Sequence, residues 1–82
     1  MVKVVKFGVC VVNDDQHSFD FVIQSLQEIF SWDTTQAANC ALLVDARGEF
    51  VVKWYDQEQP ALMAAQLIRS RGLKTKLIID RN

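Results

Sequence analysis

The acidic stretch Asn13-Asp14-Asp15 carries side chains that could bind a cation. It follows an apolar run and precedes a helical pattern. A protein's free α-amino group is an ammonium with hydrogen-bond donors only, so a site for it must supply acceptors. The side-chain oxygen of Asn13 and the carboxylate of Asp14 would supply two, while Asp15 is expected to shape the turn. Asn and Asp also end strands through Asx turns, and this stretch alone does not separate the two interpretations.

A second segment offers a further acceptor. Asp45 falls in the last turn of a predicted helix, where a carboxylate opposes the helix dipole. Arg47 would offset that charge, so a plain surface carboxylate remains an alternative. Ala41 and Val44 share the face of Asp45, and with Phe19 they would enclose a cavity for an apolar side chain. Together these residues suggest capture of a terminal amine and the side chain beside it.

Catalytic and metal chemistry receive less support. His17 is the only histidine, and a metal site built from it with Asp14 and Asp15 would lack a second nitrogen or sulfur ligand. No spacing places His17 with Cys10 as base and nucleophile, so a solvated loop residue is the simpler interpretation. Cys10 and Cys40 lie in apolar runs, which predicts buried free thiols. We therefore expect a binding module, not an enzyme, with no catalytic residue, metal or cofactor.

Length and composition narrow the class further. The 82 residues allow a single domain over 1–82, and half of them are hydrophobic. The formal net charge of -1 argues against a nucleic-acid partner, because phosphate binding rests on a basic face. No run is long enough to span a bilayer, and Lys6 and Gly8 interrupt the apolar start before it can serve as a secretory signal. A cytoplasmic protein without membrane contact is expected.

The elements that would position these residues follow from the hydrophobic pattern. Residues 5–12 alternate with period two, which predicts a strand whose odd positions are better buried. Residues 19–30 carry one apolar stripe and predict an amphipathic helix, with Ser18 as its N-cap. Either Asp33 or Thr34 would cap the next helix.

The remaining elements complete an α+β pattern. In chain order they are a helix over 35–46, a turn at Gly48, a strand over 50–55, a helix capped by Asp56 and ended by Gly72, and a strand over 73–80. Leu62, Ala65 and Ile68 are expected on the buried face of the third helix. The order β-α-α-β-α-β predicts a three-stranded antiparallel sheet with three helices packed on one face.

Four segments then resemble the ClpS family, adaptors that deliver N-degron substrates to the Clp ATPase–protease. They are Val12-Asn13-Asp14-Asp15, Phe21-Val22-Ile23, the stretch 41–48 and the helix 58–71. The first two segments, at this spacing, are fairly specific, whereas the other matches are mostly apolar. The resemblance covers nearly the whole chain and implies the ClpS-like fold. It also implies binding of proteins whose first residue is Leu, Phe, Tyr or Trp.

Site residues are implied position by position. Asn13 and Asp14 match the family's contacts to the amine and the backbone. Asp45 stands where a histidine also contacts the amine, and an aspartate still accepts from an ammonium. The departures in the pocket are Phe19 for a gatekeeping methionine, His17 for a threonine and Ala41 for a larger residue. The larger Phe19 at the gate and the smaller Ala41 at the wall should reshape the pocket, which Val44 also lines. The preference of the pocket among first residues should change with its shape.

Delivery rests on fewer matches. Glu58 matches a family contact to the AAA+ ATPase, but Met63 stands where a lysine is common. Family members also carry a flexible N-terminal extension that engages the ATPase, and little precedes the first predicted strand here. Binding of N-degron peptides is therefore better supported by the resemblance than delivery to the ATPase.

An alternative is a protein-interaction or regulatory domain on the same scaffold that does not read N-termini. The small α+β arrangement also resembles the C-terminal domain of the ribosomal stalk protein, which binds translation factors through a helical face. Trp32, Trp54 and Tyr55 would favour such a surface if exposed, since aromatic residues are enriched in interface cores. If they pack at the edges of the core, they carry no such signal.

Overall fold

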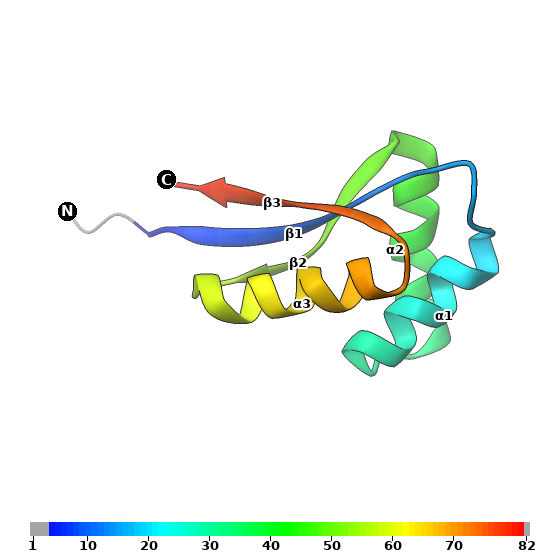
Figure 1. The fold of residues 1–82 in the computed structure, drawn as a ribbon, viewed down its shortest axis with the longest axis horizontal. Helices are drawn as coiled ribbons and strands as arrows, with labels where there is room; N and C mark the ends of the chain where they lie inside the picture. The colour runs from blue at the N-terminus through cyan, green and yellow to red at the C-terminus, as the bar shows by residue number, and fades with distance from the viewer. Residues whose placement is uncertain (1–3, 82) are drawn as a thin grey trace.

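The computed structural model describes residues 4–81 and has the predicted order β-α-α-β-α-β (Figure 1). Its elements are β1 (Lys6–Val12), α1 (Phe19–Phe30), α2 (Thr34–Arg47), β2 (Glu49–Tyr55), α3 (Glu58–Ser70) and β3 (Lys74–Asp80). The strands form one sheet in the order β2-β1-β3, and both neighbours run antiparallel to β1. The fold prediction is therefore confirmed. Figure 1 shows α3 lying along the sheet, while α1 and α2 gather near the end at which β1 finishes.

The central strand is more deeply buried than its alternation predicts. The four residues 8–11 in the middle of β1 are all buried, so both faces are covered and not only the odd one. Gly8 explains part of this result. A Cβ on Gly8 would lie 2.8 Å from the ring of Trp54 and 2.8 Å from Val51 Cγ1, so only glycine lets these β2 side chains close over the strand.

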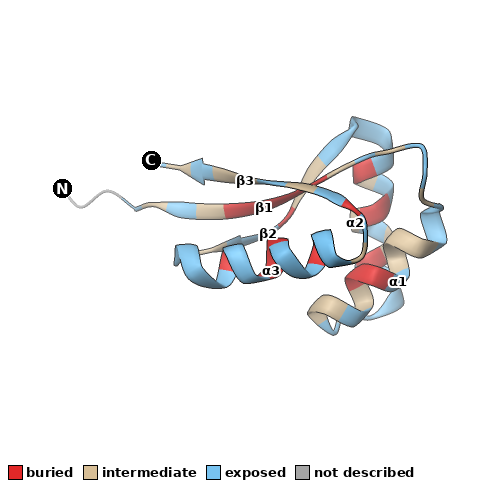
Figure 2. Cartoon of the chain, in the orientation of Figure 1, coloured by how far each residue is buried: buried red, intermediate tan, exposed pale blue. Residues whose placement is uncertain are grey.

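Helix α3 contacts the sheet through a stripe of three alanines and one isoleucine. Ala61, Ala64, Ala65 and Ile68 are buried, at positions i, i+3, i+4 and i+7. Figure 2 shows this buried side turned toward the strands. Leu62, which was expected in the core, is instead 37% exposed because it lies just outside that stripe. The small side chains at the three alanine positions permit a close approach between helix and sheet.

The helix caps mostly follow the sequence signals. The Ser18 hydroxyl accepts from the Phe21 amide at 3.1 Å, as predicted for the N-cap of α1. Asp33, not Thr34, caps α2, and its carboxylate accepts from the Gln36 amide at 2.8 Å. Helix α2 ends at Gly48, whose φ of 83° is the left-handed conformation that glycine adopts at little steric cost.

The predicted cap of α3 is wrong. Gln57 occupies the N-cap position and makes no side-chain cap hydrogen bond. Asp56 instead lies 3.7 Å from Lys6 Nζ in an exposed ion pair. The helix therefore begins one residue later than predicted. Pairing of Phe7 with Tyr55 in the sheet brings Asp56 close to Lys6 at the start of β1, and this placement follows from strand pairing rather than from the local sequence.

The aromatic residues and the thiols have mixed environments. Trp32 is half-buried and stacks on Phe30 at 4.6 Å between ring centroids, and Tyr55 is half-buried against the core. Trp54 is 44% exposed. Cys10 is buried and free as predicted, whereas Cys40 is free but only half-buried. Across residues 4–81, no helix is both long enough and apolar enough to cross a membrane.

Replacing Gly8 with Ala should destabilise the fold by about 1–3 kcal/mol, because the new Cβ must displace the Trp54 ring or Val51. Urea unfolding monitored by tryptophan fluorescence measures the change. Lys74→Ala on the exposed edge of β3 is the control and should change stability by less than about 0.5 kcal/mol. Equal effects from the two substitutions would contradict the packing argument.

Candidate functional site

The loop between β1 and α1 is fastened to the end of α2. The backbone N–H of Asn13 donates to the carbonyl of Gly48 at 2.8 Å, and Val12 pairs with Glu49 in the sheet. This places the acidic loop beside the last turn of α2, which carries Asp45. Two segments far apart in the sequence therefore meet at one end of the molecule, as the amine-site hypothesis requires.

Asp14 organises the loop. Its Oδ1 accepts from the backbone N–H groups of Gln16 at 3.0 Å and His17 at 3.1 Å, which is an Asx-type turn. The Asp14 side chain is 9% exposed. Burial acts to raise the pKa of Asp14, but the hydrogen bonds from His17 and Gln16 outweigh it and hold that pKa below its ordinary value. The carboxylate is therefore an anion already supporting the backbone of its own loop.

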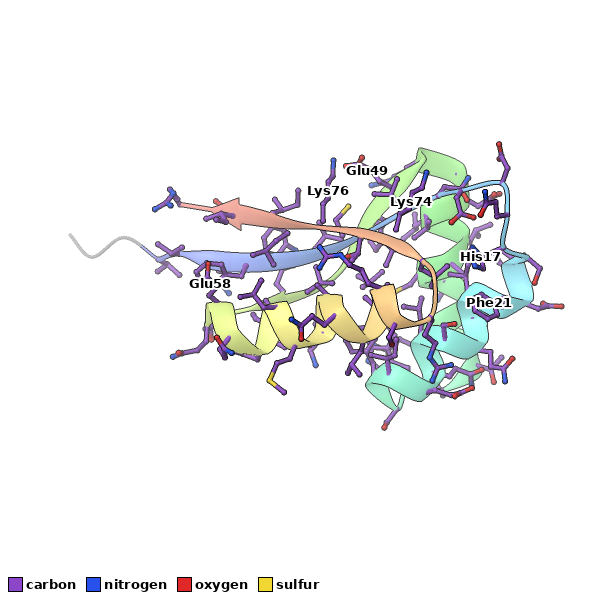
Figure 3. The ribbon with its side chains drawn as sticks, viewed as in Figure 1. His17, Phe21, Glu49, Glu58, Lys74 and Lys76 are labelled. Atoms are coloured by element: carbon purple, nitrogen blue, oxygen red, sulfur yellow. The ribbon has the colours of Figure 1, made fainter. Side chains whose placement is uncertain are left out.

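His17 has a defined place rather than a solvated one. Its Nδ1 lies 3.1 Å from both carboxylate oxygens of Asp14. The imidazole stacks on Phe21, with ring centroids 4.9 Å apart and planes 22° from parallel, and Figure 3 shows the two residues together at the start of α1. Beyond the ring lies Gly72, whose missing Cβ would stand 3.3 Å from Nε2. The His17 side chain is 22% exposed.

Sequence reasoning missed Phe21 and Gly72 as neighbours of the site. Phe21 carries a detectable signal, since it follows His17 by four residues across the start of a helix. Gly72 was interpreted only as a helix terminator. Its contact with His17 depends on the path of α3 back to the sheet, and no local pattern reports that path.

The remaining candidate residues divide into exposed and buried groups. Asn13 and Asp45 are exposed, so a ligand ammonium could reach both side chains. Phe19 is 42% exposed. Ala41 and Val44 are each only 2% exposed, on the inner side of α2, so their surfaces are covered by neighbouring core residues.

Glu58 lies apart from this group. It is exposed in the first turn of α3, and Figure 3 shows it near the opposite end of the molecule from His17 and Phe21. A hollow of about 320 Å³ opens on the same helix. Its lining comes from α1, β2 and α3 and consists of Ile29, Phe30, Ser31, Lys53, Tyr55, Pro60, Met63, Ala64 and Leu67. The ammonium of Lys53 lies 5.6 Å from the Phe30 ring centroid and 5.1 Å from that of Tyr55.

The thiols are poor nucleophiles. Burial is the main cause that raises the pKa of Cys10, and the nearby charge of Glu49 raises it further. Burial also raises the pKa of Cys40. Each thiol therefore stays protonated at neutral pH, and the thiolate is the reactive form. Within residues 4–81, no group of three or more His, Cys, Asp and Glu side chains is arranged to hold a metal ion.

One family of protease adaptors matches most of this chain. The family model described as ATP-dependent Clp protease adaptor protein ClpS matches residues 3–76. A ClpS adapter protein of Xylella fastidiosa strain M12 is 36% identical over 62 residues, covering 76% of this chain and 58% of its own length. One from Nautilia profundicola is 38% identical over 52 residues, covering 63% of this chain and 54% of its own length.

The solved structure of Agrobacterium tumefaciens ClpS2 bound to L-phenylalaninamide has a TM-score of 0.70 and 20% identity, and the match covers 96% of this chain and 99% of that one. At this identity the likeness concerns the fold. The family match is decisive, and the chain belongs to the ClpS family of Clp protease adaptors. The family is one of adaptors and not of enzymes, so the prediction of a non-enzyme is confirmed. The chain spans little more than half the length of the curated relatives it matches.

Replacing Asp14 with Ala should lower the free energy of unfolding by about 1 kcal/mol at neutral pH, because two backbone N–H groups lose their acceptor. Asp15→Ala removes an exposed neighbouring carboxylate and is the matched control.

The difference between wild type and Asp14→Ala should also depend on pH. The folded state lowers the pKa of Asp14, so its contribution is fully present above the unfolded value of 3.8 and is lost as pH falls through the folded one. Urea unfolding at about pH 7 and pH 2.5 tests this. A difference that is equal at both pH values would contradict the assigned role of the carboxylate.

Proposed function

We propose that this protein is an adaptor that binds the free α-amino group and the large hydrophobic first residue of N-degron substrates. The observation that carries the proposal is the 2.8 Å hydrogen bond from the backbone N–H of Asn13 to the carbonyl oxygen of Gly48. This bond holds the acidic loop beside the last turn of α2, which bears Asp45. Membership of the ClpS family supports it. So does the ligand of the Agrobacterium protein, because L-phenylalaninamide presents a free amine and a benzyl side chain.

The electrostatics of this end suit an ammonium. Asp14 is held as an anion, and the C-terminal end of α2 adds the negative end of a helix dipole. The Asp14 carboxylate already accepts from its own loop, but two carboxylate oxygens offer about four lone-pair positions. Among residues 4–81, the contact seen for Oδ2 is with His17 Nδ1. The Asn13 side-chain oxygen and Asp45 would supply the other acceptors.

The first side chain would rest against the inner face of α2. In this proposal Phe19 lies at the mouth, and Ala41 and Val44 form the wall. Both wall residues are buried in the described structure, so a bound side chain must displace some of the residues that now cover them. Phe19 is more exposed, at 42%. The small side chain of Ala41 would leave more room at this wall than a larger residue would.

A peptide with a free N-terminal Phe should bind, and acetylation of its amine should weaken binding by at least about 100-fold, because two charge-assisted hydrogen bonds are removed. Fluorescence anisotropy with matched labelled peptides measures both affinities. A peptide beginning with a free Gly is the control for the side chain and should also bind weakly. Equal affinity for free and acetylated Phe peptides would rule out amine recognition and favour the alternative interaction domain.

Asp14→Asn should reduce the affinity for the free Phe peptide by about tenfold while retaining the fold. The amide oxygen can still accept from Gln16 and His17, so the turn is kept and only the charge is lost. Asp15→Asn is the matched control and should change affinity by less than about twofold. Thermal unfolding checks that both variants are folded. An Asp14→Asn variant that binds like wild type would show that the carboxylate acts only within the loop.

Delivery to a Clp AAA+ ATPase is the second half of the proposal, and Glu58 is its candidate contact. The separation of Glu58 from the loop in Figure 3 supports distinct surfaces for substrate and ATPase. Glu58→Arg should therefore impair ATPase-dependent degradation of an N-degron reporter while leaving peptide affinity within about twofold of wild type. Loss of peptide binding in this variant would contradict separate surfaces.

A further inference from the structure

His17 is the histidine at the proposed amine site, and histidine is the side-chain type that commonly changes its charge near neutral pH. Its Nδ1 is 3.1 Å from both oxygens of Asp14. Since both oxygens accept, Nδ1 must carry a proton even in the neutral ring. The second proton would then go to Nε2 and leave a cation against the carboxylate that the substrate ammonium also requires.

The ring is fixed in this position on several sides. Phe21 stacks on one face at 4.9 Å, and Gly72 adjoins Nε2 without a Cβ to hold it away. The ring cannot move away from the Asp14 carboxylate without losing these contacts. A positive charge on the ring would therefore interact mainly with Asp14 rather than being solvated by water. An imidazolium is also favoured over an aromatic face, so the stack with Phe21 does not oppose protonation.

The other charges on the packed elements leave Asp14 as the main electrostatic partner. On α1 the residue that meets the ring is the uncharged Phe21, while Asp20 is exposed in the first turn. Where α3 turns toward β3, Arg71 precedes Gly72, and its guanidinium is engaged by Glu28 at 2.7 Å. On the loop itself, Asp15 is exposed, and no contact to the ring is seen among the described residues.

We propose that His17 competes with the substrate's α-ammonium for the Asp14 carboxylate, so that uptake of one proton by His17 weakens N-degron binding in mildly acidic conditions. The inference rests on the proposed function and adds its regulation by pH. A neutral His17 orients Asp14 through one hydrogen bond and leaves its charge available. A protonated His17 neutralises that charge and repels the incoming cation.

Affinity for a free N-terminal Phe peptide, measured from about pH 7.0 to 5.0, tests the competition. A peptide amine has an ordinary pKa of about 7.7–8.0, so it is protonated across this range. Wild type should bind about 5- to 10-fold more weakly at pH 5.0 than at pH 7.0. His17→Asn keeps a donor near the Nδ1 position without titrating, so its affinity should change by less than about twofold over the same range.

A second measurement uses wild type alone and avoids any effect of substitution on folding. By reciprocal linkage, a proton that weakens peptide binding must itself bind less readily when the peptide is present. Saturating peptide should therefore move the NMR titration midpoint of the His17 ring to lower pH by about 0.7 to 1 unit, the logarithm of the fold-change. An unmoved midpoint, or equal pH profiles in wild type and His17→Asn, overturns the inference and leaves the adaptor function standing. Failure to bind the peptide at any pH overturns both.

Discussion

The hydrogen bond between the Asn13 amide and the Gly48 carbonyl connects the two halves of the proposed site. It forms where β1 ends and β2 begins, because pairing of Val12 with Glu49 brings Asn13, which follows β1, close to Gly48, which precedes β2. Gly48 can occupy this position since its left-handed backbone ends α2 and turns the chain directly into β2. The acidic loop is thus positioned by the sheet rather than by its own residues.

A second constraint acts inside the loop. Asp14 must support the backbone of residues 16 and 17, contact the His17 ring and, in the proposed function, receive an ammonium. These roles share one carboxylate, so structure and binding are coupled at a single side chain. His17 belongs to this coupling because Phe21 and Gly72 keep its ring beside Asp14. A mobile side chain at the same position would leave the carboxylate to the substrate alone.

Much of the architecture was predictable because local patterns report it well. The apolar stripe of α1, its Ser18 cap and the Gly48 turn all follow from residue spacing and from side chains that bond to nearby backbone groups. The failures concern tertiary placement. Leu62 fits a helical stripe as well as its neighbours do, but the sheet selects the row of alanines beside it. Gly8 gives no sign in isolation that a tryptophan ring will lie over it.

The sequence by itself determined the fold class and the acceptors from which an amine site would be built, since these depend on periodicity and residue type, and it indicated the family through the resemblance of four segments to ClpS. Only the tertiary structure decided that Gly72, from a distant part of the chain, confines the His17 ring, whereas the contacts of that ring with Asp14 and Phe21 are local ones. It also decided that Ala41 and Val44 are covered. The physical reason is that burial and hydrogen-bond partners arise between elements distant in the chain, where residue type limits the possible contacts but does not choose among them.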